Sequence, residues 1–407
     1  MDNPPRSQRL PLTFILITVM IDSMGIGLII PVMPDLIREV DGGSLAEAAV
    51  WGGVLSTIFA VMQFLFAPIL GSLSDQFGRR PILLISLVVM ALDYLIMAVA
   101  GAIWLLFLGR MVGGITAATQ SVANAYMADI STAEEKSARF GLVGAAFGVG
   151  FVLGPLIGGL LAEFGTRAPF YAAAALAAAN AVFGFLVLPE TVTDATRRRF
   201  TWARANPLGA FSAVTALPGL KRLVAVFFLY QVAFWVYPAI WAYFTRARFG
   251  WDAAMVGLSL ASFGIAIALV QGGLIRVILR YLGDRGTVIF GLCFNFCAFL
   301  ALALVTNSTL ALILTPLTAL GAVVTPALQG IASRTVSANA QGELQGVLTS
   351  TMALSMILSP LIMTGVFWQF TSESAPVFLP GAPFLVSMVL MVVCAIVYLA
   401  RPEQQAA

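Results

Sequence analysis

Three charged side chains stand inside long apolar stretches of the sequence, where charge is costly to bury. They are Asp22, Asp93 and Arg110, and all three fall in the first half of the chain. On insertion scales each costs about 2.5–3.5 kcal/mol at the centre of a membrane helix, so such residues face a protein interior and are functional by default. A carboxyl group in that position takes up and releases protons. Asp22 and Asp93 are therefore candidates for proton coupling.

Depth within the apolar stretches separates the three charges. At about 1.5 Å per helical residue, Asp93 lies ~12 Å below the outer end of its stretch and Arg110 ~9 Å below the outer end of the next one. Two antiparallel neighbours at similar depth are able to pair, whereas Asp22 lies near the middle of the first stretch. The alternative is structural: an Asp93–Arg110 ion pair, with Asp22 satisfied by hydroxyl groups. For Arg110, a structural or acid-tuning role stands beside direct contact with a substrate.

Membrane-spanning helices are the elements that must position these charges. The chain of 407 residues is 60% hydrophobic and only 10% charged, whereas soluble proteins carry about a quarter charged residues. A span needs roughly 20 apolar residues, and twelve segments meet this requirement: 11–33, 47–70, 82–101, 104–126, 138–162, 169–188, 223–245, 254–275, 287–305, 308–332, 344–368 and 381–400. We expect an all-α membrane protein of twelve transmembrane helices. Two six-helix halves, residues 1–188 and 223–407, are joined by a linker at 189–222, and the first span is expected to be an uncleaved one.

The basic residues fix the expected orientation. Of 22 Lys and Arg residues, only four fall in the outer connections (Arg38, Arg167, Arg246 and Arg248), and one is Arg110. The other 17 lie on the opposite side: Arg6, Arg9, Arg79, Arg80, Lys136, Arg139, Arg197, Arg198, Arg199, Arg204, Lys221, Arg222, Arg276, Arg280, Arg285, Arg334 and Arg401. By the positive-inside rule both termini are cytoplasmic. The basic linker then reads as a cytoplasmic loop beside the lipid bilayer, and no nucleic-acid partner is predicted.

Histidine and cysteine usage argues against a metal centre. The chain has no histidine, and its three cysteines (Cys293, Cys297 and Cys394) lie in apolar segments. Two thiols four residues apart, without histidine or acids, make a poor metal site. We therefore predict neither a bound metal nor a cofactor.

One short polar loop, between the second and third spans, carries a recognisable pattern. It reads G-x-x-x-D-x-x-G-R-R, and its members are Gly71, Asp75, Gly78, Arg79 and Arg80. It resembles the signature of the major facilitator superfamily of secondary transporters, which usually has a basic residue where this chain has Gln76. The resemblance implies an inner gate in which Asp75 lies near Gly342 at the start of span 11 and Arg79 reaches Asp129. A weaker copy, Leu282-Gly283-Asp284-Arg285, follows about 205 residues later, with Arg280 in place of the acid.

The fifth span carries a glycine pattern of greater specificity. It reads G-x8-G-x3-G-P-x2-G-G from Gly141, through Gly150, Gly154, Pro155, Gly158 and Gly159. Small residues at this spacing let helices approach closely. The full spacing resembles the antiporter motif of facilitator drug exporters.

The resemblance extends over nearly the whole chain and is to the tetracycline-efflux branch of the drug:proton antiporters. It is carried by Asp22-Ser-Met-Gly-Ile-Gly, Leu92-Asp93-Tyr94, Gly109-Arg110, Phe244-Thr and Leu328-Gln329-Gly330. It implies a bacterial inner-membrane exporter that exchanges a drug, as a metal chelate in that branch, for a proton. Asp22, Asp93 and Arg110 then correspond to the branch's intramembrane charges. The chain departs from the branch at Asn295, where an acid is usual, and at Ile267, where a histidine is usual.

Polar and aromatic side chains of the second half are candidates for a substrate site. Aromatic rings with a few amides suit an amphipathic drug, and the candidates are Gln231, Trp235, Gln271, Asn295 and Gln329. For Trp241 and Tyr243 the alternative is an aromatic belt at the membrane surface. Export of a native metabolite or an unrelated drug remains the other function. An intramembrane aspartyl protease would need Tyr-Asp and Gly-x-Gly-Asp contexts, which are absent, and a non-transporting receptor has no positive signal; we expect no enzyme.

Overall fold

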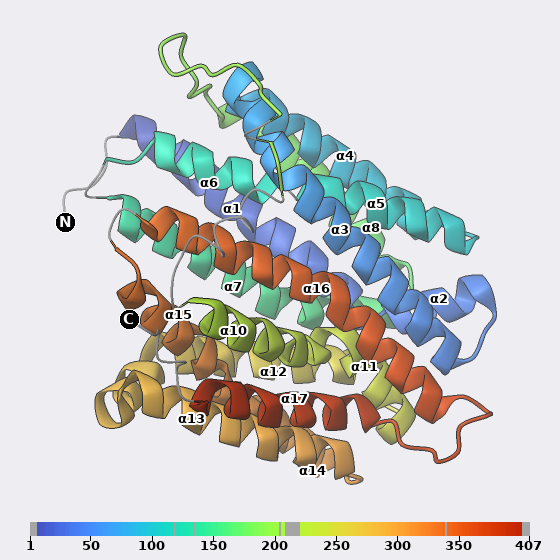
Figure 1. Ribbon diagram of the computed structural model, residues 1–407. Coiled ribbons are helices and arrows are strands. Elements are labelled where there is room, and N and C mark those ends of the chain that lie inside the picture. The colour runs from blue at the N-terminus through green and yellow to red at the C-terminus, as the bar shows by residue number, and fades with distance from the viewer. Residues whose placement is uncertain are drawn as a thin grey trace. The chain divides into compact units, whose positions relative to one another are not determined.

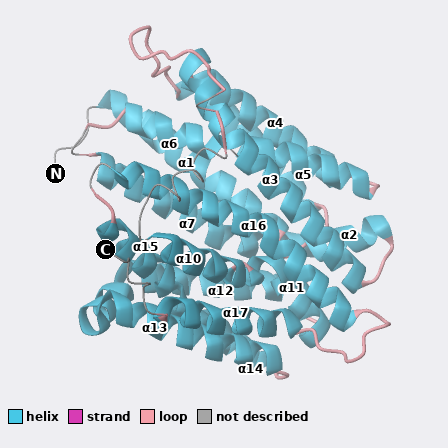
Figure 2. Cartoon of the chain, viewed as in Figure 1, coloured by secondary structure: helices cyan, strands magenta, loops and turns pink. Residues whose placement is uncertain are grey.

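The computed structural model describes residues 6–117, 119–132, 135–202, 205–207, 220–337 and 340–400 (Figure 1). Every regular element in these ranges is helical (Figure 2). Arg204, Arg401 and most of the second part of the linker lie outside the described residues, as do the side chains of Arg6 and Arg9. A chain in hydrocarbon must satisfy its backbone polar groups internally, and helices do this within each segment.

The first compact unit comprises residues 1–207 together with Gly250–Gly264. Its helices are α1 (Arg6–Ile29), α2 (Met33–Asp41), α3 (Leu45–Phe77), α4 (Arg79–Val99), α5 (Ile103–Ala117), α6 (Thr119–Asp129), α7 (Lys136–Leu161) and α8 (Ala168–Val187), with the first part of α12 (Ala253–Leu269). Helix α1 packs against α7 and α8, and α5 packs against α3 and α4. The three charged side chains therefore come from helices of one unit.

The second compact unit comprises residues 208–249 and 265–407. Its helices are α10 (Leu220–Phe234), α11 (Val236–Phe249), the end of α12, α13 (Ile275–Leu304), α14 (Ser308–Thr318), α15 (Val324–Thr335), α16 (Gln341–Thr371) and α17 (Ala382–Leu399). Helix α17 packs against α13 and α10, and α16 against α10 and α11.

The described helices account for the twelve predicted spans. Ten are long and apolar enough to cross a membrane. One of these, 253–304, contains two predicted spans, separated by a kink at Gly283 with a φ of 65°. The fourth predicted span is divided between α5 and α6, on either side of position 118. The predicted all-α, twelve-helix architecture is confirmed.

Several spans are less regular than their hydropathy suggests. Helix α1 ends at Ile29 rather than at residue 33, and the unpredicted helix α2 follows it, with prolines at 31 and 34. A π-helical turn at Val270–Leu274 interrupts span 8, and a 3-10 segment at Ala319–Val323 interrupts span 10. Such turns change the carbonyl geometry of a helix and are frequent at functional positions.

Candidate functional site

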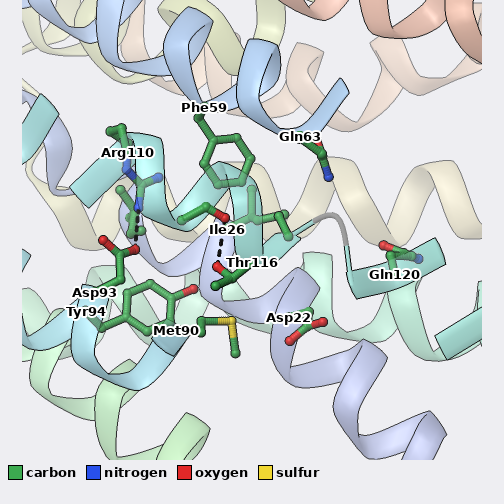
Figure 3. Close-up of a pocket in the computed structure, with 13 residues that line it drawn as sticks. Asp22, Ile26, Phe59, Gln63, Met90, Asp93, Tyr94, Arg110, Thr116 and Gln120 are labelled. Atoms are coloured by element: carbon green, nitrogen blue, oxygen red, sulfur yellow. Dashed lines mark hydrogen bonds and ion pairs between the residues drawn. The ribbon is translucent and has the colours of Figure 1, made fainter. Parts of the chain in front are cut away.

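The three intramembrane charges line one pocket in the first unit. Asp22 comes from α1, Asp93 from α4 and Arg110 from α5 (Figure 3). The other lining residues are mostly apolar or amide-bearing: Ile26, Ile29, Phe59, Gln63, Met90, Tyr94, Gly113, Thr116, Ala117 and Gln120. Folding thus brings together the charges that the sequence places on separate helices.

Asp93 and Arg110 pair, as their depths predicted. Arg110 Nη2 lies 3.9 Å from Asp93 Oδ2, and the Asp93 side chain is only 1% exposed. Neither Asp93 oxygen has a hydrogen-bond partner among the described residues. Arg110 instead donates to Met97 Sδ at 3.0 Å, and its guanidinium lies 5.1 Å from the Phe59 ring centroid. The contact is electrostatic without a hydrogen bond, which leaves both carboxyl oxygens available to a proton.

Two glycines of α5 make room for this carboxylate. A Cβ added at Gly109 would lie 3.0 Å from Asp93 Oδ1, and one added at Gly113 would lie 2.7 Å from Asp93 Oδ2. Any larger residue at position 113 would displace the Asp93 side chain. The Gly109-Arg110 pair and Gly113 thus form the surface of α5 on which Asp93 lies.

Asp22 lies apart from the Asp93–Arg110 pair (Figure 3). Its Oδ1 is buried and has no hydrogen-bond partner among the described residues. The adjacent hydroxyl does not satisfy it, because Ser23 Oγ donates to the carbonyl of Met20 at 3.1 Å. The alternative in which hydroxyl groups hold Asp22 is not supported by these contacts.

The glycine pattern of α7 packs directly on the part of α1 that carries Asp22. A Cβ at Gly150 would collide with the Met20 carbonyl and Ser23 Oγ, and one at Gly154 would lie 2.5 Å from the Met24 carbonyl. Gly158 meets the backbone of Leu28 in the same way. The next residues of the same pattern lie against the part of α12 that belongs to this unit. A Cβ added at Gly159 would lie 2.5 Å from the Ala253 carbonyl oxygen, and one added at Gly257 would collide with the Pro155 carbonyl oxygen.

Replacing Gly154 by alanine is expected to destabilise the first unit and reduce transport. Its Cβ would require α1 and α7 to separate, and overpacking of this kind costs about 1–3 kcal/mol. The matched control is Gly148→Ala on the same helix, because a Cβ there meets nothing within 4 Å. Thermal unfolding of the purified proteins measures the difference. Equal melting temperatures for the two variants would contradict the assigned α1–α7 contact.

The predicted polar loop is helical except at Gly78, because α3 continues to Phe77 and α4 begins at Arg79. This junction contains the contact between Arg79 and Asp129 that the family signature implies, together with a second ion pair to Asp75. Arg79 Nη1 lies 2.7 Å from Asp75 Oδ1, and Arg79 Nε lies 3.2 Å from Asp129 Oδ2 at the end of α6. Arg80 Nη2 donates to the Phe185 carbonyl at 2.9 Å. Gly78 has a φ of 108°, a backbone conformation that favours glycine. Gly71 lies on the last turns of α3, one turn before Asp75.

Glu190, at the start of the linker, is part of this network and was missed by sequence reasoning. Its carboxylate accepts hydrogen bonds from the backbone N–H groups of Arg79 at 2.9 Å and Arg80 at 3.2 Å. Thr191 Oγ1 donates to Asp129 Oδ2 at 3.0 Å. The only signal in the sequence is an acid two residues after the predicted sixth span, at the start of a linker that is basic overall.

Gln76, which departs from the family signature, also contacts the linker. Its side-chain Oε1 accepts a hydrogen bond from the backbone N–H of Phe200 at 2.9 Å, and the Asp75 carbonyl accepts one from the N–H of Arg198 at 3.1 Å. Two hydrogen bonds therefore hold the first part of the linker against the C-terminal turn of α3.

Asn295, in the second unit, is fully buried and makes structural hydrogen bonds. Its Nδ2 donates to the carbonyls of Gly291 at 2.9 Å and Gly321 at 3.0 Å, and Tyr230 also donates to the Gly321 carbonyl at 2.9 Å. Gly321 belongs to the 3-10 segment of span 10. Asn295 Oδ1 has no partner among the described residues.

The other candidates in the second unit differ in burial. Gln231 is buried and accepts a hydrogen bond from Thr325 at 3.3 Å, while Trp235 and Gln329 are half-buried. Gln271 is exposed and lies in the π-helical turn of span 8.

The aromatic residues of α11 pack inside the second unit. Trp241 is 1% exposed and Tyr243 is 5% exposed, so neither forms a belt that faces lipid. Phe384 of α17 packs edge-on against Phe244 with ring centroids 5.0 Å apart, and Tyr237 lies 5.6 Å from Phe299. These contacts are aromatic packing in the core of the unit.

Comparison with known proteins agrees with this geometry. The Major Facilitator Superfamily model matches residues 15–360 and also 222–407. The class C tetracycline resistance protein of Escherichia coli is 41% identical over 94% of this chain and 95% of its own length. The class G protein of Vibrio anguillarum is 42% identical over 86% of this chain and 89% of its own length. The crystal structure of the human organic anion transporter MFSD10 shares the fold, with a TM-score of 0.69 and 24% identity over 97% of this chain and 100% of that one. The chain therefore belongs to the major facilitator superfamily, in the group that contains the tetracycline resistance proteins.

Proposed function

We propose that this protein exports a tetracycline-like or other amphipathic drug across the bacterial inner membrane, in exchange for protons, by alternating access. The observation that carries the proposal is the pocket shared by Asp22, Asp93 and Arg110. Among the described residues, Asp22 Oδ1 and both carboxyl oxygens of Asp93 have no hydrogen-bond partner. Arg110 Nη2 lies 3.9 Å from Asp93 Oδ2. The identity to tetracycline resistance proteins over most of the chain supports the same activity.

Protonation of Asp93 is the step that we assign to coupling. As a carboxylate it attracts Arg110, whereas as a neutral acid it leaves Arg110 with Met97 and Phe59 as neighbours. An ionisable group in a low-dielectric site interacts strongly with a nearby charge, so one proton changes the relative stability of two conformations. Asp22, on α1, is the second proton carrier.

The substrate and gate assignments follow from the same proposal. Gln231, Trp235, Gln271, Asn295 and Gln329 of the second half contact or support the drug. The ion pairs of Asp75, Arg79 and Asp129, with Gly71, Gly78 and Arg80, hold the inner gate. The approach of Asp75 to Gly342 stays a prediction. We assign the halves as residues 1–188 and 223–407, with both termini in the cytoplasm.

Asn295 favours a second candidate function, the export of a native metabolite or of a drug unlike tetracycline. An amide at this position carries no charge, whereas the branch usually has an acid. A metal–tetracycline chelate is cationic, and this chain offers it one acid fewer. A panel of antibiotics tested in an efflux-deficient host decides between the candidates. Resistance to tetracyclines supports the first, and resistance to other compounds alone supports the second.

Replacing Asn295 by aspartate is expected to make transport more dependent on pH and to favour cationic metal–tetracycline over neutral drugs. Asn295 donates to two backbone carbonyls, and a carboxylate in its place would face those oxygens without a proton to share. Only the protonated acid keeps a hydrogen bond to the Gly321 carbonyl. Export rates measured across pH for a cationic and a neutral drug test this, with Asn295→Ala as the packing control. Unchanged selectivity and pH profile in an active Asn295→Asp variant would place position 295 outside the pathway.

A further inference from the structure

Three charged residues form the ion pairs at the junction of α3 and α4, and a constant offset of 205 residues takes each of them to a charged residue in the second half. It takes Asp75 to Arg280, Arg79 to Asp284, and Asp129 to Arg334. The sign of the charge is reversed at all three positions. The same offset takes Gly78 to Gly283, so the charges of opposite sign follow corresponding glycines in the two halves.

The two glycines have similar conformations and the two central charges have equivalent partners. Gly78 has a φ of 108° and a ψ of 151°, and Gly283 has a φ of 65° and a ψ of 177°. Each is followed by the charged residue that begins the next helical segment. Arg79 pairs with Asp129 across 3.2 Å, and Asp284 pairs with Arg334 at the end of α15.

Helix dipoles give the reversal a physical consequence. Anions are stabilised near the N-terminus of a helix and cations near its C-terminus. In the second half Asp284 follows the kink that opens a helical segment and Arg334 lies in the last turn of α15, so both charges suit their positions. In the first half Arg79 begins α4 and Asp129 ends α6, so both oppose the dipole.

The first pair is accordingly supported by additional groups. Glu190 supplies the negative charge at the N-terminus of α4 by accepting from the N–H groups of Arg79 and Arg80. Thr191 donates to Asp129, and Asp75 adds a second carboxylate to Arg79. The offset of 205 takes Glu190 to Ala395 within α17, which has no such group.

We infer that Asp284 and Arg334 form a second inner latch, a charge-reversed counterpart of Arg79 and Asp129, which positions the inner ends of spans 9 and 10 during the transport cycle. The inference rests on the proposed function. The latch is made of positioning residues and lies at the inner end of its helices, outside the drug-contact residues. It acts on the rate of the conformational step, which sets turnover in many proteins that move loops or domains, and leaves the affinity for substrate unchanged.

Charge reversal at each position, alone and combined, tests the latch. The variants are Asp284→Arg, Arg334→Asp and the double exchange, with Asp284→Glu as the conservative variant. The control is Arg276→Asp, which makes the same charge change as Arg334→Asp at an exposed arginine of a different helix, α13. Uptake of tetracycline with Mg²⁺ into inverted membrane vesicles, per molecule of protein, gives the maximal rate and the KM. Melting temperatures of the purified proteins are measured in parallel.

We expect each single reversal to lower the maximal rate about five-fold, since an exposed ion pair contributes up to about that factor, with no change in KM. Asp284→Glu and Arg276→Asp stay near the wild-type rate. The double exchange recovers most of the loss, although not all of it, because each charge then opposes its helix dipole. Single variants as active as Arg276→Asp, or a double exchange no better than the singles, would overturn the latch.

Failure of the proposed function is distinguishable from failure of the latch. A wild-type protein that does not move tetracycline counts against the proposed substrate, and the melting temperatures then decide on the ion pair. A melting temperature that falls in both single variants and recovers in the double exchange supports the ion pair. Decreases in melting temperature that add up in the double exchange overturn it.

Discussion

Replacing Asp22 by asparagine is expected to abolish drug export driven by a pH gradient while leaving the protein inserted in the membrane. The substitution keeps the size of the side chain and removes the exchangeable proton. Asp22 has no hydrogen-bond partner at Oδ1 whose loss would unfold the unit. Inverted membrane vesicles with an imposed gradient measure the effect, and uptake is expected to fall to the level of vesicles without the protein.

Asp194→Asn is the matched control for this variant. It removes one carboxylate by the same substitution from a fully exposed side chain in the linker, outside the spans. It is expected to transport as the wild type does. The proton role would be wrong if an Asp22→Asn, Asp93→Asn double variant still concentrated substrate against a gradient.

Replacing Arg110 by methionine is expected to destabilise the protein strongly as well as to stop transport. The change leaves Asp93 buried without a cation, and removal of one partner from a buried ion pair costs about 3–5 kcal/mol. Thermal unfolding of the purified protein measures the loss. The effect exceeds that expected for Gly154→Ala, because a buried charge is left without compensation.

A double variant separates the structural part of this effect from the coupling part. Arg110→Met with Asp93→Asn removes both charges, and replacing a buried pair by neutral groups is often without cost to stability. We expect the melting temperature to recover while gradient-driven uptake stays absent. Uptake at the wild-type rate in the double variant would show that the pair is structural alone.

Hydropathy and charge predicted the spans and the Asp93–Arg110 pair because both depend on the chain's own local pattern. Asp93 and Arg110 lie on consecutive antiparallel helices, so residue depth alone brings them together. The contact between Arg79 and Asp129 was predicted from the resemblance to the family signature and not from hydropathy or depth. The interruptions at Val270–Leu274 and Ala319–Val323 were not predicted, because an apolar stretch has the same hydropathy whether its turns are α, π or 3-10.

The remaining parts of the site depend on how helices face one another. Gly109 and Gly113 matter because they lie under the Asp93 carboxylate, and helix rotation is not encoded in a run of apolar residues. Glu190 reaches Arg79 across 111 positions in the chain. Asn295 was predicted to contact substrate because it is an amide in a half rich in aromatic side chains, whereas its Nδ2 donates to the Gly321 carbonyl in the 3-10 segment of span 10.

The central claim, export of a drug in exchange for protons, is tested most directly in liposomes that contain only the purified protein. With an acidic interior and a neutral exterior, tetracycline with Mg²⁺ is expected to accumulate inside, and a protonophore that collapses the gradient is expected to stop it. Liposomes with the Asp22→Asn, Asp93→Asn variant are expected to show no accumulation. Accumulation that persists after the gradient is collapsed, or that the double variant retains, would contradict proton coupling through the pocket of Asp22, Asp93 and Arg110.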